Sequence, residues 1–326
     1  MNKQIGAYGV KKFNYVTSNL PAVVNDESLE LITKSLFTGK TGSKFRIQTG
    51  IKSTEDLHYL ESELFYQTDT GCTFTASGDT SFASRTITVG KIKVQQSFCA
   101  KQLEGFWTEK ALRAGSTYDY IAFEEDWKNY LVGLMGQAQE VALWRSALGS
   151  GVQNLDKYDG FLKIIDNASA VTVNGNPTGI TNGTGITTAN VLGIFQKMAT
   201  LLPAGVRYKD DVEFMVDPLI LDTLLIALQN ANLYALNVIE GTEYNNMSIK
   251  LPAFGIKIEA YMGLLSTNRI ILGRTSNFVI GTDLENDEDT FDIRQNPIDL
   301  NMLVDVHFKT GTQIALPNEI VTFKLV

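Results

Sequence analysis

The stretch from residue 118 to residue 148 constrains the fold of this chain more than any other feature. Its apolar side chains recur at intervals of three and four residues, which is the spacing of one face of an α-helix. Ser116 with Asp119 forms a capping-box pattern at the start, and residues 149–151 (GSG) stop it. A helix of about thirty residues is roughly 45 Å long, so we expect a spine on which other elements pack. The positions predicted to face the core include Phe123, Trp127, Leu131, Leu134 and Val141.

Two β-rich segments precede this helix, at residues 64–75 and 85–98. The small polar residues between them (ASGDTSFAS) favour a turn, so we predict a long β-hairpin. In its second strand the apolar residues are Ile87 and Val89 and then Ile92 and Val94, so the alternation slips by one residue at Gly90. This slip predicts a β-bulge at the glycine. Because a two-stranded ribbon is marginally stable alone, we expect it to lie on another surface, such as a second subunit.

The rest of the chain has the pattern of a mixed α/β domain followed by antiparallel strands. Strands are predicted at residues 44–51, 161–165, 213–216, 256–260, 269–272, 291–294, 303–309 and 319–325. Helices are predicted at residues 189–202 and 217–228, the second beginning at an Asp-Pro pair. Together with the hairpin and the spine, these elements predict an α+β fold.

Residues 37–44 (FTGKTGSK) contain the letters that end a phosphate-binding P-loop. That loop needs a second glycine five positions before Gly39, and this position is Lys34. It also needs a helix directly afterwards, whereas Phe45 and Ile47 alternate with polar residues as in a strand. We therefore interpret the stretch as a glycine turn.

The sequence has few residues in patterns that indicate catalysis. Histidine-based catalysis has only His58 and His307, neither of which lies in a recognisable motif. Cys72 and Cys99 offer no paired zinc-ligand spacing with them, and in a reducing compartment both would stay reduced. The acidic run at residues 283–292 (DLENDEDTFD) is expected to be a solvated loop, with a calcium site as the open alternative because its oxygens cluster without EF-hand spacing.

The charge of the chain is unevenly distributed. Residues 1–52 contain eight Lys or Arg against three acidic residues, a charge of +5, which leaves −13 for the remainder of a chain with net charge −8. An acidic body disfavours nonspecific nucleic-acid binding, whereas a basic N-terminal arm can contact acidic surfaces or DNA, or merely keep the arm soluble. No apolar run is long enough to cross a bilayer and no signal peptide is recognisable, so we expect a protein made in the cytoplasm.

The order of these elements resembles the HK97-type major capsid proteins of tailed double-stranded DNA bacteriophages. The resemblance rests on VGKIKVQQSFCAKQLEG (89–105), the spine (118–151), FMVDPLILDTLLIAL (214–228) and FDIRQNPIDLNMLVDVHFKTGTQIALP (291–317). It implies an N-terminal arm at 1–52, an extended loop with its base at 53–100, a peripheral domain with the spine at 101–150, an axial domain at 151–283, peripheral return strands at 284–310 and a C-terminal axial strand at 311–326.

The resemblance implies a structural protein with no catalytic site, cofactor or metal. Such a chain would assemble with itself into hexamers and pentamers of an icosahedral virion shell that encloses double-stranded DNA without reading its sequence and without a membrane. Portal and scaffold proteins, and a decoration protein, are the further partners that it implies. Gly39 and Gly42 would be hinges of the arm. The extended loop would contact neighbouring subunits through Phe74, Phe82, Arg85, Ile87 and Val89.

Two departures from the family pattern limit what carries over. Some members form a covalent cross-link from a lysine of the extended loop, but residues 71–84 contain no lysine, and Lys91 and Lys93 lie lower on the hairpin. Some members also begin with a long scaffolding segment, whereas only a short arm precedes the hairpin here. We therefore expect no cross-link, and either a separate scaffold protein or none.

Two other hypotheses remain open at the level of the sequence. An encapsulin-type nanocompartment has the same fold, and particles filled with an enzyme and free of DNA would favour it. A cytosolic enzyme with carboxylate chemistry at Asp287 or Asp289 belongs to a different class. In that case replacing either aspartate by alanine would abolish an activity and leave assembly unchanged.

Overall fold

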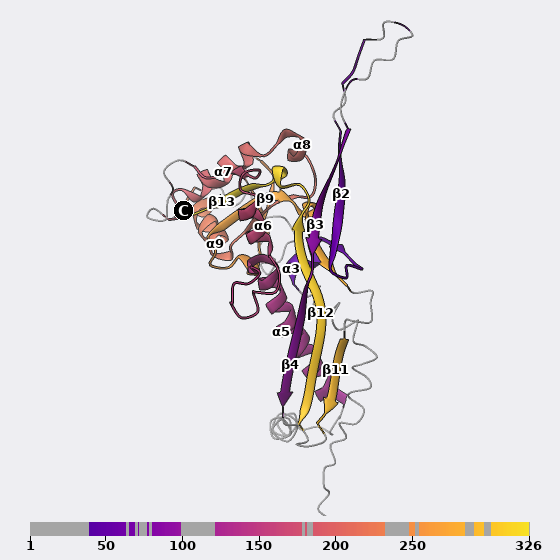
Figure 1. The fold of residues 1–326 in the computed structure, drawn as a ribbon. Coiled ribbons are helices and arrows are strands. Elements are labelled where there is room, and N and C mark those ends of the chain that lie inside the picture. Colours follow the sequence, from indigo (N-terminus) through magenta and orange to yellow (C-terminus); the bar gives the residue numbers. More distant parts are fainter. Residues whose placement is uncertain are drawn as a thin grey trace, which may run out of the picture.

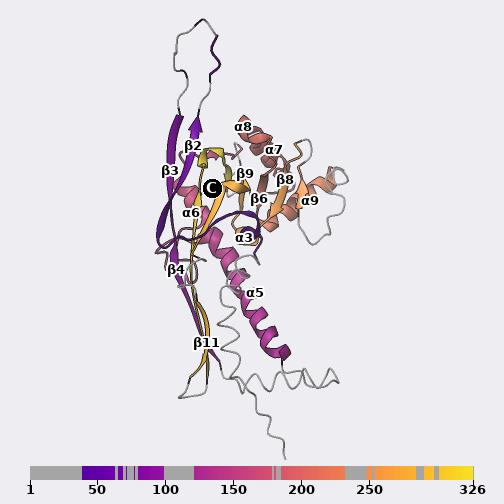
Figure 2. The same cartoon turned by 90° about the vertical axis from the view of Figure 1, so that its right-hand side faces the viewer.

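The structure is a computed structural model that describes residues 39–62, 65–68, 71, 77, 80–98, 121–177, 180, 185–231, 248–251, 254–283, 290–296 and 301–325. The described part is elongated (Figure 1 and Figure 2). An α/β unit lies to one side, a layer of long strands with one long helix runs away from it, and a β-hairpin points in the opposite direction. No helix in the described ranges is long and apolar enough to cross a membrane.

The α/β unit is built on a six-stranded mixed sheet. In spatial order its strands are β5 (Val173–Asn174), β13 (Val321–Lys324), β9 (Arg269–Arg274), β6 (Val212–Val216), β8 (Lys257–Ala260) and β7 (Ser248–Lys250). Helices α7 (Val191–Leu201) and α9 (Pro218–Asn230) pack with one face of this sheet in a single apolar cluster. The other face, including Met215 and Ile271, packs in a second cluster. All five residues of β6 are buried because both faces of the strand are covered.

Local chemistry sets the start of α9. The Asp217 side chain accepts a hydrogen bond from the backbone N–H of Leu219 at 3.0 Å, and Pro218 occupies the first helical position. Both are typical of a helix N-terminus, because the carboxylate satisfies a free N–H and proline has none to satisfy. The short helix α8 (Ala204–Arg207) likewise follows a proline.

The long strand layer is a second, five-stranded sheet. It contains β1 (Arg46–Gln48), β10 (Phe278–Thr282), β12 (Met302–Ile314), β11 (Thr290–Gln295) and β4 (Gly90–Phe98). Its longest strand, β12, has 13 residues and joins the two ends of the molecule. The end of β12 near Ile314 pairs with β10, while residues 302–310 pair with β4 and residues 302–307 with β11. The hairpin strands β2 (Thr54–Ser62) and β3 (Thr80–Thr88) form a separate two-stranded sheet.

Helix α5 (Ile121–Arg145) is the described part of the predicted spine. Its C-terminal end packs against the 3-10 turn η4 (Met262–Leu264) and helix α6 (Phe161–Asn167). A Cβ atom on Gly263 would lie 2.2 Å from Cδ1 of Trp144 and 2.5 Å from the backbone oxygen of Glu140, so only glycine permits this approach. The rest of α5 runs beside β4 and β12, away from the α/β unit (Figure 2).

Most predicted elements are present, and two predictions are wrong. Residues 161–165 begin helix α6, not a strand. The described hairpin is formed by β2 with β3, so it uses only residues 85–88 of the second predicted segment, and the remainder of that segment, β4, pairs with β12; most of the first predicted segment lies outside the described residues. The slip in alternation at Gly90 therefore marks the point where the chain leaves one sheet and joins another, not a bulge. A Cβ on Gly90 would lie 2.2 Å from the backbone oxygen of Lys157, which explains the glycine.

Candidate functional site

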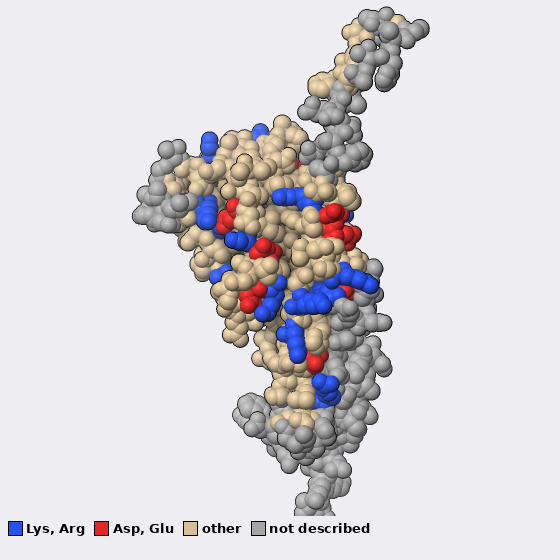
Figure 3. Space-filling view, in the orientation of Figure 1, with Lys and Arg blue, Asp and Glu red and all other residues tan. Residues whose placement is uncertain are grey.

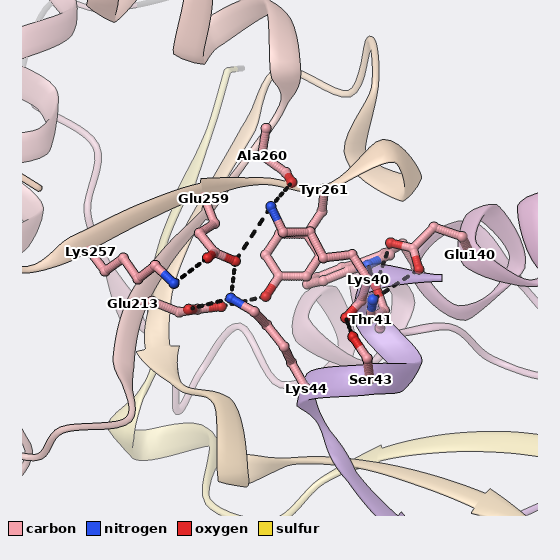
Figure 4. A network of polar contacts seen from close by, with 11 residues as sticks. Lys40, Thr41, Ser43, Lys44, Glu140, Glu213, Lys257, Glu259, Ala260 and Tyr261 are labelled. Carbon is pink, nitrogen blue, oxygen red and sulfur yellow. Dashed lines mark hydrogen bonds and ion pairs between the residues drawn. The ribbon is translucent and has the colours of Figure 1, made fainter. Parts of the chain in front are cut away.

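The residues that resemble a P-loop form a tightly held junction. Residues 40–44 are the short helix α3 (Lys40–Lys44), which lies against α5 near the second cluster (Figure 4). The buried carboxylate of Glu140 accepts hydrogen bonds from the backbone N–H of Thr41 at 3.0 Å and from its hydroxyl at 2.6 Å. The Thr41 hydroxyl in turn accepts one from the indole N–H of Trp144 at 2.7 Å. One threonine thus satisfies two buried polar groups of α5.

The same helix places two lysines beside carboxylates of the six-stranded sheet. Lys44 contacts Glu213 of β6 at 3.4 Å and also Glu259 of β8, and Lys40 lies 3.5 Å from Glu259. Lys257 of β8 is a third cation on Glu259. Because Glu213 and Glu259 are 5% and 3% exposed, these lysines supply the positive charge that two buried carboxylates require. Residues 39–48, which comprise α3 and β1, are called the clasp segment below.

An aromatic cluster lies directly beside these charges. Phe45, the residue after α3, has ring centroids 5.7 Å from Trp144, 5.5 Å from Phe161 and 5.0 Å from Phe278. Tyr261 joins the cluster at 5.7 Å from Phe45 and donates a hydrogen bond from its hydroxyl to Glu213. The clasp segment is therefore held both by apolar packing and by buried polar bonds.

Burial shifts the acid–base properties of these carboxylates in different directions. Burial raises the pKa of Glu140 and of Glu213, and it outweighs the hydrogen bonds that each accepts from Thr41 and Tyr261 respectively. At Glu259 burial acts in the same sense, but bonds from Lys257 and Lys44 outweigh it and lower the pKa. Burial also lowers the pKa of Lys40, partly offset by Glu259. The cluster thus contains one firmly ionised carboxylate and two that take up a proton more readily.

A groove lies between α5 and the long strand layer. It has a volume of about 450 Å³, and its walls come from α5, β4, β12 and the loop at residues 153–158. The apolar walls include Leu131, Leu134, Met135, Val306 and Phe308. Among the described residues that line it there are two lysines, at 93 and 157, and no Asp or Glu. The groove therefore has apolar walls interrupted by amide side chains, and one of its two lysines, Lys157, is paired with Asp156 at 3.0 Å.

The structure corrects the predicted core face of the spine. Leu131 is buried, Val141 is half-buried and Leu134 is 42% exposed in the groove, while the side chains of Phe123 and Trp127 lie outside the described residues. The buried residues of α5 include two polar ones. Glu140 bonds to Thr41, and Leu143 and Trp144 pack in the second cluster, whereas the other polar residue, Gln139, is buried and lines the groove. The helix is rotated because Glu140 must reach Thr41 and Trp144 must reach the aromatic cluster.

The structure also corrects the predicted contact residues of the extended loop. Ile87 and Val89 are buried within this chain, in a cluster with Ile51, Leu57 and Val279, and so they hold the base of the hairpin on β10. Arg85 donates to the backbone oxygen of Ile314 of the same chain at 3.2 Å. Phe74 and the side chain of Phe82 lie outside the described residues. Ile87 and Val89 therefore hold the hairpin to its own body, whereas the predicted contacts of Arg85, Phe74 and Phe82 with a neighbouring subunit stay predictions.

The hairpin ends in exposed aromatic residues that the sequence analysis did not single out. Phe65 and Tyr66 follow β2, and they are 58% and 96% exposed. Among the described strands, β2 and β3 pair only with each other, so this part of the molecule has little packing of its own. Both rings are therefore available for contact with another molecule.

The predicted hinge glycines are held in place by packing. Gly39 has φ −76° and ψ 147°, values open to any residue, and a Cβ there would lie 2.5 Å from Oε2 of Glu140. Gly42 is buried within α3. Gly39 therefore allows close contact between α3 and Glu140 of α5, and a hinge role of Gly39 and Gly42 stays a prediction.

The other residues considered for catalysis or metal binding do not form one site in the described part of the chain. His58 is exposed on β2, and His307 on β12 lies 3.1 Å from Asp305. Cys72, Cys99, Asp287 and Asp289 lie outside the described residues, as do residues 284–289 of the acidic run. Within the described ranges no group of three His, Cys, Asp or Glu residues could hold a metal ion. On the face drawn in Figure 3, basic and acidic side chains are interspersed.

Comparison of the structure with solved structures identifies its fold. The chain is similar to the satellite phage P4 procapsid that includes the size determination (Sid) protein, with a TM-score of 0.62, 12% identity and coverage of 90% of this chain and 89% of that one. It is also similar to the capsid of the empty GTA particle, with a TM-score of 0.55 and 11% identity over 90% of both chains. The capsid of Myoviridae phage XM1 matches with a TM-score of 0.51 and 12% identity, covering 89% of this chain and 92% of that chain.

These likenesses confirm the mixed α+β capsid fold of the HK97 type that the sequence predicts. They extend over about 90% of this chain. No protein-family model matches the sequence, and no curated protein matches it. The fold is thus recognised through the structure at an identity of 10–13% in the structures compared.

Proposed function

We propose that this chain is the major capsid protein of a tailed bacteriophage or a related particle. In this proposal it assembles into hexamers and pentamers of an icosahedral shell that encloses double-stranded DNA, and it has no catalytic role. The observation that carries the proposal is the capsid fold over 90% of the chain. The elongated shape supports it, because the projecting hairpin and helix α5 carry exposed apolar side chains, at Phe65, Tyr66, Tyr130 and Leu134, that neighbouring subunits can cover.

We assign the parts of the chain as the sequence predicted, with one refinement. The arm comprises residues 1–52, the axial domain comprises most of 151–283 with the C-terminal strand, and the peripheral domain comprises 101–150 and 284–310. The extended loop is narrower than 53–100, because β4 pairs along β12 and so belongs with the peripheral domain. The loop proper consists of β2, β3 and their connection.

The hairpin of one subunit is proposed to contact the groove of a neighbour. Its exposed tip residues, Phe65 and Tyr66, are aromatic, and the groove walls are apolar. Residues 53–79 of the hairpin contain six acidic residues and no lysine or arginine, whereas the groove rim has two lysines and, among its described lining, no acid. Because Lys157 is already paired with Asp156 at 3.0 Å, the apolar contact is the main support for this pairing. Phe74 and Phe82 remain candidate contact residues of the same loop.

A portal protein, a separate scaffold protein and a decoration protein are the further partners we propose. The P4 procapsid to which this chain is similar includes a size determination protein, which illustrates an accessory protein bound to such a shell. The enclosed DNA is held by confinement. The mixed charges on the face in Figure 3 suit a wall that does not bind DNA tightly.

Electron microscopy of the expressed protein after size-exclusion chromatography, with ultraviolet absorbance on the same fractions, tests this function. Shells, tubes or rings of six are expected, in the presence of a scaffold protein if one is needed. A chain that stays monomeric at high concentration with the scaffold present would contradict the proposal. Particles that contain an enzyme and no nucleic acid would instead indicate a nanocompartment shell.

The hairpin contact has its own test, a disulfide between subunits. The variant Tyr66→Cys/Leu134→Cys, made with Cys72 and Cys99 replaced by serine, is expected to form covalent chains of subunits on mild oxidation of assembled particles. The matched control Tyr66→Cys/Leu219→Cys places the second thiol on α9, at a residue that is exposed to a similar degree. Equal cross-linking of the two variants would rule out the groove as the hairpin's contact.

A further inference from the structure

One buried polar group in the groove has no hydrogen-bond partner. Gln139 lies on α5 one turn after Met135 and two turns after Leu131, and all three residues line the groove. Gln139 is 6% exposed, and its side-chain oxygen Oε1 is buried and makes no hydrogen bond with the described residues. A buried amide oxygen that has lost water and gained no donor costs free energy. A molecule that brings a hydrogen-bond donor into the groove would remove this cost.

The other polar groups of the described groove lining do not have this need. The Tyr158 hydroxyl is also buried, but it faces the hydroxyl of Ser146, which does not line the groove. The amide side chains of Gln95, Gln96 and Gln153 are exposed, so water can bond to them. Gln139 is therefore the group that distinguishes one ligand of the groove from another.

The surroundings of Gln139 define the kind of side chain that fits. The groove has a volume of about 450 Å³ and apolar walls from α5, β4 and β12, so a ligand needs an apolar body with a hydrogen-bonding group at its end. A tyrosine side chain has this form. Its hydroxyl can donate to the amide oxygen or accept from the amide N–H, so it satisfies either orientation of the glutamine. A lysine would bring a charge into apolar surroundings, and a phenylalanine would leave the oxygen unpaired.

Three tyrosines in the described part of the chain are more than half exposed. They are Tyr66 at 96%, Tyr208 at 88% and Tyr130 at 64%. Tyr130 lies on α5 itself, and Tyr208 follows α8 in the α/β unit. Tyr66 follows β2, a strand of the hairpin that projects away from the body (Figure 1). Of the three, Tyr66 is thus the one that extends away from its own subunit.

We propose that Tyr66 of a second copy of this chain enters the groove and that its hydroxyl bonds to the Gln139 side chain. This inference rests on the proposed function, because the second copy is the neighbouring subunit of the shell. The rings of Phe65 and Tyr66 both supply apolar area, whereas the bond to Gln139 determines which of the two rings is inserted. Gln139 is then a polar residue that is satisfied only in the assembled state.

A double-mutant cycle on the full-length chain tests this bond. Tyr66→Phe keeps the ring and removes the hydroxyl, and Gln139→Met keeps an unbranched side chain and removes the amide. The measured quantity is the concentration at which half of the chain is assembled, with any scaffold protein held constant. Each single variant is expected to raise this concentration about threefold to tenfold, as for the loss of one hydrogen bond. The double variant is expected to raise it no further, because both substitutions remove the same bond.

Two controls separate this bond from other effects. Tyr208→Phe removes a hydroxyl from a tyrosine of similar exposure outside the hairpin, and it is expected to show no coupling to Gln139→Met. In urea denaturation the unassembled Gln139→Met chain is expected to be at least as stable as the native chain, because it loses a buried oxygen without a partner.

Three outcomes would overturn the proposal, and they are distinguishable. Additive effects of Tyr66→Phe and Gln139→Met would show that water or another donor serves Gln139. A clear loss of stability in unassembled Gln139→Met would show that the amide is bonded within its own chain. A native chain that does not assemble would contradict the proposed function and this contact with it, whereas the first two outcomes leave the proposed function standing.

Discussion

The α/β unit and the long strand layer bury their apolar residues in opposite ways. The six-stranded sheet is covered on both faces, by α7 and α9 on one side and by α5, α6 and the aromatic cluster on the other. The long strand layer shares an open groove with α5, and the hairpin beyond it has two exposed aromatic residues. Exposed large apolar side chains lie in both regions, at Leu219 and Ile226 of α9 and at Tyr130 and Leu134 of α5. The two regions therefore differ in how completely their sheets are covered, and not in whether they expose apolar side chains.

Truncation of a core residue of the α/β unit is expected to have the largest effect on stability. Phe214 on β6 is fully buried and its ring centroid lies 4.9 Å from that of Phe195 on α7. Phe214→Ala is expected to lower the free energy of unfolding by about 3–5 kcal/mol, because it removes transfer energy and leaves a cavity. Urea denaturation of the unassembled chain measures this. Tyr66→Ala, at a residue that is 96% exposed, is the control and is expected to leave the midpoint unchanged. An equal loss of unfolding free energy in both variants would show that the two regions do not differ in how they are stabilised.

The boundary between the two regions is expected to be less sensitive but still critical. Gly263→Ala would place a methyl group 2.2 Å from Trp144 and 2.5 Å from a backbone oxygen of α5, so α5 must shift away from η4. Overpacking of this kind costs about 1–3 kcal/mol. Gly193→Ala is the control, because nothing lies within 4 Å of a Cβ there and alanine favours the helix α7. Thermal unfolding should separate them, and a Gly263→Ala chain as stable as the native one would mean that α5 is not fixed by this contact.

The acid sensitivity that the Asp166–Arg269 pair gives to the α/β unit should be modest. Asp166 accepts two bonds from Arg269, at 2.6 and 2.8 Å; burial opposes its ionisation, but these bonds outweigh burial and lower its pKa. Its contribution to stability is present above the unfolded pKa, near 3.8, and is lost as pH falls through the lower folded value. The carboxylate is 38% exposed, so screening limits the effect to about 1 kcal/mol or less.

Asp166→Asn tests this pair. The variant is expected to be slightly less stable than the native chain at pH 7 and equally stable at the lowest pH at which both remain folded. Asp222→Asn, an exposed position of α9, is the control and should change neither value. A native chain whose advantage over Asp166→Asn does not shrink in acid would show that Arg269 does not hold this carboxylate ionised.

The sequence predicted elements better than it predicted their partners. The period of apolar residues located α5, and the Asp-Pro pair located α9, because both signals are local. The same period misassigned the face of α5, since Glu140 and Gln139 are polar yet buried, and a period that counts apolar residues cannot detect them. The pairing of β4 with β12 joins residues more than 200 positions apart, and no turn between them sets the register. The pairing of strands that are distant along the chain could thus not be predicted from this one sequence.

The clasp illustrates the same limit at the level of single residues. The GKT stretch resembled a phosphate-binding loop, and its letters are explained by contacts with Glu140, Glu213 and Glu259, which lie 99 to 215 positions away along the chain. Gly39 is small because Glu140 is close, and Thr41 is polar because Glu140 and Trp144 need a hydroxyl. The one local signal was an excess of positive charge at the start of an acidic chain. It indicated a segment that needs an acidic partner without showing where that partner lies.

Leu134→Ala is expected to have the smallest effect on the isolated chain and is the sharpest test of the comparison. A buried leucine costs about 2–5 kcal/mol when truncated, but Leu134 is 42% exposed in the groove, so we expect a loss of about 1 kcal/mol or less in the unassembled protein. Leu224→Ala, at a fully buried position of α9, supplies the full core value as a control. In assembly the order is expected to reverse, so that Leu134→Ala assembles less well than Leu224→Ala when each variant is compared at a temperature where it is folded. The reason is that, of the two residues, only Leu134 lies on the surface that a neighbouring subunit is proposed to cover. If Leu134→Ala assembles as well as the native chain, the groove does not belong to the interface, and the long strand layer must be stabilised by some other contact.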